Sequence, residues 1–226
     1  MNTLNNHWLL TVSREIRHME SDVGENDNRF YTIGHSNHSI GQFTGLLRQH
    51  GITAIADVRS TPYSRYLPQY NKDALAVSLE KEGIKYVFLG RELGARPDDP
   101  TCYENGRVDF GRLAEREEFK SGLERVRQDS EKYRIALMCA EKEPMDCHRT
   151  ILVCKILKRQ GVIIKHILPD GALEDHMDTE YRLLKLSNCE QDLFNQDVSD
   201  SARLEYAYKK RASEIVYRRG NKAGGF

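Results

Sequence analysis

The sequence has no long hydrophobic run and no excess of one charge. Its longest apolar stretches, such as YVFL and VII, are far too short to span a membrane, and its polar start MNTLNN does not resemble a signal peptide. Lys+Arg and Asp+Glu number 34 each, so no overall positive field attracts nucleic acid or acidic membranes. We therefore expect a cytoplasmic protein with no membrane partner, in which any basic site is local.

Cysteines are also few, and their number is odd. The five are Cys102, Cys139, Cys147, Cys154 and Cys189. In a chain without an export signal, this count argues against a disulfide framework and leaves reduced thiols, catalytic thiols or metal ligands. Within ILVCKIL, Cys154 has the spacing of a small core residue on a helix.

Strand and helix patterns alternate five times between residues 30 and 167. The predicted strands are FYTIGH, TAIADV, KYVFLG, RIALMC and VIIKHI, and the predicted helices cover residues 39–51, 71–83, 110–128 and 149–161. Helical crossovers connect parallel strands, so the pattern predicts an open three-layer α/β sandwich, Rossmann-like, with a mostly parallel sheet of about five strands.

The composition divides the chain into three parts. Residues 1–28 form a polar N-terminal extension, residues 29–172 the α/β domain, and residues 173–226 a charged, helical C-terminal extension. We expect the helices of the last part to pack outside the sheet or to bind a protein partner.

Residues with reactive or charged side chains directly follow the predicted strands. In open parallel sheets, ligands bind at the carboxyl ends of the strands, so these side chains should share one rim. Polar loops are common there in any α/β protein, but hydrophobic strands followed by His, Cys, Arg and Asp favour a functional site. The rim residues are His35, Asp57, Arg59, Ser60, Arg91, Glu92, Cys139, Glu141 and Asp170.

The stretch LMCAEKEPMDCHR is predicted to be a strand-to-helix elbow. Cys139 ends the strand, and Cys147, His148 and Arg149 begin the next helix. A helix N-terminus lowers the pKa of a cysteine and attracts anions, so Cys147 is a candidate thiolate. Arg149, with Arg59, is a candidate for holding phosphate or carboxylate, or else for an ion pair within the rim.

The segment DVRSTPYSRYLPQYN mixes arginines with tyrosines. Such a segment can hold phosphates and stack bases, with Tyr63 among the candidates, or it can be a surface loop whose tyrosines pack on the sheet edge.

Four motifs, YTIGHS, DVRSTPYS, FLGRELGARP and LMCAEKEPMDCHR, resemble those of the family of domains of unknown function numbered 488. The resemblance covers about residues 30 to 171. It implies an α/β fold and a rim built from His35, Asp57, Arg59, Arg91, Glu92, Cys139, Glu141, Cys147, His148 and Arg149. It implies no reaction.

Several functions are compatible with this rim. The first is an enzyme acting on a phosphate-bearing substrate, a nucleotide or nucleic acid, with Cys147, Cys139, Glu141 and His35 as catalytic groups through thiolate or glycosidase-like carboxylate chemistry. Its substrate-binding residues would be Arg59, Arg149, His148, Asp57, Ser60, Arg91, Glu92 and Tyr63. A zinc or iron site at Cys139, Cys147 and His148, a binding module without chemistry, and rhodanese-like sulfur transfer remain open.

Overall fold

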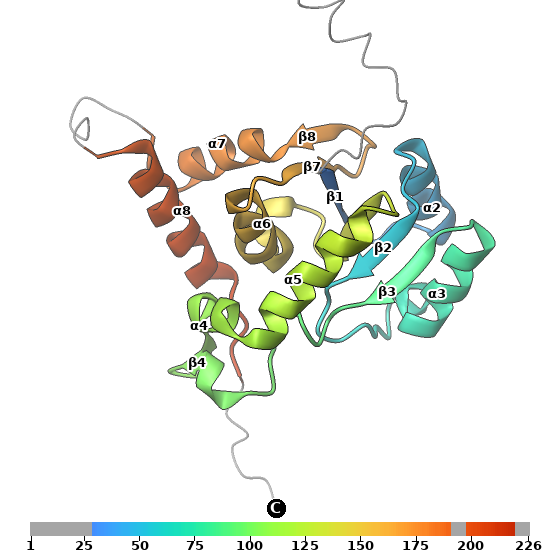
Figure 1. Cartoon of the computed structure of the whole chain (residues 1–226), viewed down its shortest axis with the longest axis horizontal. Coiled ribbons are helices and arrows are strands. Elements are labelled where there is room, and N and C mark those ends of the chain that lie inside the picture. Colours follow the sequence, from blue (N-terminus) through green and yellow to red (C-terminus); the bar gives the residue numbers. More distant parts are fainter. Residues whose placement is uncertain (1–28, 191–197, 220–226) are drawn as a thin grey trace, which may run out of the picture.

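The computed structural model describes residues 29–190 and 198–219 (Figure 1). The predicted N-terminal extension lies outside these residues. Within them, no helix has the length and apolar character needed to cross a membrane.

A mostly parallel sheet of six strands forms the middle layer, which confirms the predicted α/β fold. The order is β3-β2-β6-β1-β7-β8, and all neighbours are parallel except β7 and β8. The strands are β1 (Arg29–Gly34), β2 (Ala54–Asp57), β3 (Lys85–Phe88), β6 (Ile135–Cys139), β7 (Ile163–Ile167) and β8 (Leu173–Asp175). The sixth strand was not predicted, and it adds residues that the sequence assigned to the C-terminal extension.

Helices cover both faces of the sheet because successive strand residues point to opposite sides. In β1, Phe30 belongs to one apolar cluster and Tyr31 to the other. The first cluster is covered by α5 (Glu117–Ser130) and by the helical segment after β6, and the second by α2 (Ile40–Gln49) and α3 (Lys72–Lys81). Ser39 and Gln42 form a capping box at the start of α2, where the sequence predicts a helix.

Two predicted helices differ from the structure. The single helix expected at 110–128 is divided into α4 (Phe110–Glu115) and α5 by Arg116, whose backbone is extended (φ −67°, ψ 140°). The helix after β6 begins as a π-helix, Arg149–Cys154, before α6 (Lys155–Arg159). The wider π-helical turn leaves no sign in the nearly continuous apolar run ILVCKIL. The break at Arg116 does interrupt the apolar period, because the residues three and four positions after Leu113 are Arg116 and Glu117.

The C-terminal part is helical, as predicted, and packs on the rest of the chain. Helices α7 (His176–Leu186) and α8 (Asp200–Ile215) share a small apolar cluster with Met145 and Ile151. β4 (Tyr103–Glu104) and β5 (Arg107–Val108) form a short hairpin. After α8, the backbone of Arg218 forms an antiparallel β-bridge with Arg107 of this hairpin. Helix α8 therefore lies beside the loop that follows β6, and residues 217–219 lie beside the β4–β5 hairpin.

Candidate functional site at the carboxyl rim of the sheet

The parallel register brings the central strand ends together at one rim. Gly34 of β1 pairs with Cys139 of β6, and Asp57 of β2 pairs with Met138. The backbone N–H of His35 donates to the Cys139 carbonyl (2.9 Å). The predicted convergence of the β1, β2 and β6 ends at a single edge is therefore present.

Two thiols and one imidazole form a buried cluster at this rim. The Nδ1 atom of His148 lies 3.8 Å from Sγ of both Cys139 and Cys147. Its other ring nitrogen donates to the Val58 carbonyl (3.1 Å), so Nδ1 faces the sulfurs. The Arg149 N–H donates to the Cys147 sulfur (3.4 Å), at the start of the π-helix. The two sulfurs and the His148 ring nitrogen, which are atom types that bind metal ions, all lie within 4.8 Å of one another.

The two thiols differ in acidity. A hydrogen bond from Cys147, together with the charge of His148, lowers the pKa of Cys139 to about 6. Burial raises the pKa of Cys147 well above its usual value. Partial desolvation opposes ionisation of Glu141, but hydrogen bonds from the two thiols lower its pKa to about 2. These pKa shifts favour Cys139 as the thiol that ionises first, whereas the sequence, from the position of Cys147 near a helix N-terminus, suggested Cys147.

Asp57 and Arg59 form a buried ion pair beside the cluster. Asp57 accepts hydrogen bonds from Arg59 Nε (2.9 Å) and Nη2 (2.6 Å) and from Tyr86 Oη (2.7 Å). Arg59 also donates to the carbonyl of Tyr70 and to Nε2 of His35. Most of the N–H groups of Arg59 are therefore used within the protein, and its expected role as an anion clamp is reduced.

His35 is held as a neutral imidazole. Its Nδ1 donates to the Ser36 carbonyl (2.9 Å), and its ring stacks on Tyr70 with centroids 4.0 Å apart. Burial, reinforced by the charge of Arg59, lowers the pKa of His35 to about 4. Its position suits orientation of Arg59 better than proton transfer near neutral pH.

Arg149 is fully buried behind the elbow. Its Nη1 donates to the backbone carbonyl of Glu141 (2.9 Å), and its Nε has no hydrogen-bond partner. Gly34 leaves the space for this contact, because a Cβ atom there would lie 1.9 Å from the Glu141 oxygen. Arg149 therefore holds the elbow from behind and does not face the pocket described next.

A small pocket of about 170 Å³ opens in front of the cluster. Cys139, Glu141 and His148 line it, as do Arg59 and Ser60, all of which the sequence placed at the rim. Arg96, Asp146 and Tyr217 are among the further lining residues, which the sequence did not predict. Arg96 lies in the quoted LGARP motif, but Tyr217 comes from the end of the chain, and only the fold brings it here.

Several predicted site residues lie elsewhere. Arg91 is exposed, and Glu92 lies near Arg125 of α5 (3.9 Å); neither lines the pocket. Tyr63 is 64% exposed and also lies outside the pocket lining. Asp170 accepts a hydrogen bond from Ala172 N–H in its own turn (3.0 Å).

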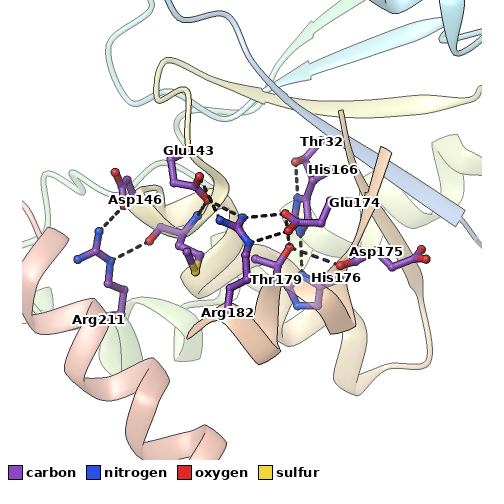
Figure 2. Close-up of polar contacts among 11 residues, drawn as sticks. Thr32, Glu143, Asp146, His166, Glu174, Asp175, His176, Thr179, Arg182 and Arg211 are labelled. Atoms are coloured by element: carbon purple, nitrogen blue, oxygen red, sulfur yellow. Dashed lines mark hydrogen bonds and ion pairs between the residues drawn. The ribbon is translucent and has the colours of Figure 1, made fainter. Parts of the chain in front are cut away.

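The C-terminal helices hold the loop between β6 and the π-helix, as Figure 2 shows. Arg182 of α7 pairs with Glu143 of this loop (2.8 Å) and with Glu174 (2.6 Å). Arg211 of α8 pairs with Asp146 and donates to the Met145 carbonyl (3.1 Å). These contacts fix one wall of the pocket from outside the strand-to-helix motif.

A buried chain of hydrogen bonds connects the sheet to α7 and α8, and Figure 2 shows its first part, from Thr32 to His176. Thr32 bonds to His166 Nδ1 (2.7 Å), and His166 Nε2 bonds to His176 Nδ1 (2.9 Å). His176 then contacts Tyr208 Oη (3.1 Å), which donates to Glu180 (3.0 Å). Burial lowers the pKa of His166 well below its usual value and that of His176 to about 4, so both rings are neutral near pH 7.

These neutral histidines predict acid sensitivity. The unfolded chain takes up protons at pH values where the folded chain does not, so stability is complete above the unfolded pKa of about 6.5 and falls as pH decreases toward the folded value. For His176 alone, we expect about 2 kcal/mol less free energy of unfolding at pH 5 than at pH 7. Urea unfolding at both pH values measures this loss. A His176→Gln variant should lose less over the same interval, and an equal loss would contradict the prediction.

Comparison with known proteins gives one match. A family model described as "Domain of unknown function DUF488" matches residues 39–156, just over half of the 226 residues. No curated protein and no solved structure matches the chain. The matched region contains the elbow and most of the pocket, whereas Ile215 and Tyr217 of the pocket wall lie beyond it.

Proposed function

We infer that this chain, which belongs to the DUF488 family, is an enzyme that acts on a phosphate-bearing substrate, a nucleotide or the end of a nucleic acid. The observation that carries the proposal is that one pocket is lined by the Cys139 thiol, the His148 imidazole and the Glu141 carboxylate. Arg96, which is exposed, also lines it. Such groups can supply a nucleophile, a proton donor and a base within reach of one bound molecule.

Arg96 is the best candidate for binding the substrate's anion. Its backbone N–H donates to Ser60 Oγ (2.9 Å), which fixes the loop, and its guanidinium lies over the Tyr217 ring at 4.5 Å. Within the described part of the chain, Arg96 forms no ion pair, unlike Arg59. An exposed guanidinium that stacks on an aromatic ring can bind a phosphate through the N–H groups at its own edge. The aromatic ring can then stack on a nucleic-acid base of the substrate.

The size of the pocket limits what enters it. At about 170 Å³, it is smaller than the cavities of roughly 300 Å³ or more that enclose whole drug-sized ligands. A phosphate or one sugar-phosphate unit suits this volume, and the remainder of the substrate would extend over the surface. Glu141, next to the thiols, is then the candidate base or nucleophile for hydrolysis or transfer at that unit.

Binding of phosphate ligands tests the proposal. We expect a nucleoside monophosphate, or a short 5′-phosphorylated single-stranded DNA, to bind the parent protein in calorimetric titrations. An Arg96→Gln variant should bind at least about tenfold more weakly, the usual effect of losing one charge-assisted hydrogen bond.

Arg91 provides the matched control. It is exposed and lies five residues earlier, but it does not line the pocket. An Arg91→Gln variant should therefore bind as the parent does. If no phosphate ligand binds, or if both variants weaken binding equally, phosphate recognition at this pocket is wrong.

A further inference from the structure

The cluster behind the pocket has the composition of a zinc site. We infer that Cys139, Cys147 and His148 bind one zinc ion through two sulfurs and Nδ1, with the fourth coordination position open to the pocket. Only the catalytic role of the ion rests on the proposed function; its binding does not. Uptake of Zn²⁺ by the thiol form releases the two thiol protons to solvent, because thiolates are the ligands.

The distances agree with shared coordination. Zinc–sulfur bonds of about 2.3 Å and zinc–nitrogen bonds of about 2.0 Å in tetrahedral geometry separate sulfur from nitrogen by about 3.5 Å and sulfur from sulfur by about 3.8 Å. Here Nδ1 lies 3.8 Å from both sulfurs, and all three atoms lie within 4.8 Å. To complete this geometry, each sulfur–nitrogen distance would shorten by about 0.3 Å and the distance between the sulfurs by at most about 1 Å.

The groups around the cluster orient these atoms as ligands. Metal-binding histidines generally donate their second ring N–H to a carbonyl or carboxylate, and His148 donates Nε2–H to the Val58 carbonyl (3.1 Å). The Arg149 N–H donates to the Cys147 sulfur (3.4 Å) and so helps to orient it beside His148. Within the part of the chain that the structure describes, no other group of three metal-ligating side chains meets in this way.

The open side of the site faces the pocket. Cys139 and His148 line the pocket together with Glu141, whereas Cys147 lies behind them. Three protein ligands with one free position are typical of catalytic zinc, where water or substrate completes the coordination. Two thiolates and one imidazole also suit zinc better than an iron–sulfur cluster, which is usually held by four cysteines.

Metal content measures the inference directly. For protein purified under reducing conditions without chelator, elemental mass spectrometry should find about one zinc per chain. Cys139→Ser and Cys147→Ser should each lose most of it. Cys154→Ala removes another buried thiol, from the π-helix and outside the cluster, and should keep it.

Cobalt provides a second readout that does not need activity. The metal-free protein loaded with Co²⁺ should show the absorption bands of tetrahedral cobalt and a thiolate-to-cobalt charge-transfer band, reduced by about half in either serine variant that still binds cobalt. A parent protein that contains no zinc and takes up neither metal would overturn the inference. So would iron in place of zinc, or a Cys139–Cys147 disulfide in the reduced preparation.

The two proposals fail independently. If Arg96→Gln loses phosphate binding and the parent contains no metal, the proposed function stands and the zinc site is rejected. The candidate nucleophile is then the metal-free Cys139 thiolate. Zinc in the parent without any phosphate binding would keep the metal site and reject the substrate class.

Discussion

An Asp57→Asn variant should lose about 3–5 kcal/mol of unfolding free energy, the usual cost of removing one partner from a buried ion pair. Asp57 is fully buried, and Arg59 is 6% exposed. The carboxylate accepts hydrogen bonds from the Arg59 side chain, from the Arg59 backbone N–H (3.1 Å) and from Tyr86. An asparagine would leave the guanidinium charge uncompensated and would turn an NH₂ group toward these donors.

A surface ion pair supplies the control for Asp57→Asn. Arg48 and Glu82 lie 3.0 Å apart, but their side chains are 62% and 30% exposed. A Glu82→Gln variant should therefore lose less than about 1 kcal/mol. Urea denaturation of both variants beside the parent at pH 7 measures the difference. If Asp57→Asn loses no more free energy of unfolding than Glu82→Gln, then another group compensates the charge of Arg59 and the prediction is wrong.

The effect of Asp57→Asn should extend to the pocket. Arg59 lines the pocket and also holds His35 and the Tyr70 carbonyl, so its orientation fixes several groups at once. We expect weaker binding of a nucleoside monophosphate even at temperatures where the variant is folded. This coupling explains why a motif residue can matter for function while its side chain is engaged within the protein.

Much of the fold could be predicted because it depends on local patterns. Alternating apolar strands and amphipathic helices define the parallel sheet, and the register then brings His35, Asp57 and Cys139 to one edge. The β8 strand was missed because three residues, Leu173–Asp175, are too short to show a period. The break at Arg116 was missed because the segments on either side are each amphipathic, although Arg116 and Glu117 occupy the positions where a single helix would continue the apolar stripe of Leu113.

The site was only partly predictable because its geometry depends on distant segments. The elbow sequence placed Cys139, Cys147 and His148 together, since the chain itself joins them. It could not show that His148 bonds to Val58, or that Tyr217 stacks with Arg96, because these partners lie far apart in sequence. Residue type alone also could not show which arginine is exposed at the pocket: Arg59 lines it but is buried and bonded to Asp57, Arg149 is buried outside its lining, and Arg96 is exposed.

A Gly34→Ala variant should lose about 3 kcal/mol, at the upper end of typical overpacking costs. An alanine Cβ at this strand end would lie 1.9 Å from the Glu141 carbonyl oxygen and 3.2 Å from Arg149 Nη1. The oxygen is backbone and is held by Arg149, so it cannot move without displacing the elbow. The free energy of unfolding from urea denaturation measures this cost.

Gly41→Ala is the matched control for Gly34→Ala. Gly41 lies in α2, and a Cβ atom there meets nothing within 4 Å. Alanine has the higher helix propensity, so this variant should be as stable as the parent or up to about 1 kcal/mol more stable. Equal stability of the two alanine variants would mean that the Glu141 carbonyl can move freely.

The clash at Gly34 also tests whether the elbow and the metal site depend on each other. Because Glu141 lies between Cys139 and the residues just before the π-helix, a displaced carbonyl should move Cys147 and His148 relative to Cys139. We therefore expect Gly34→Ala to lose zinc together with stability, although it removes no ligand. Retained zinc in a strongly destabilised variant would show that the three ligands move with the loop as one unit and do not require a fixed strand end.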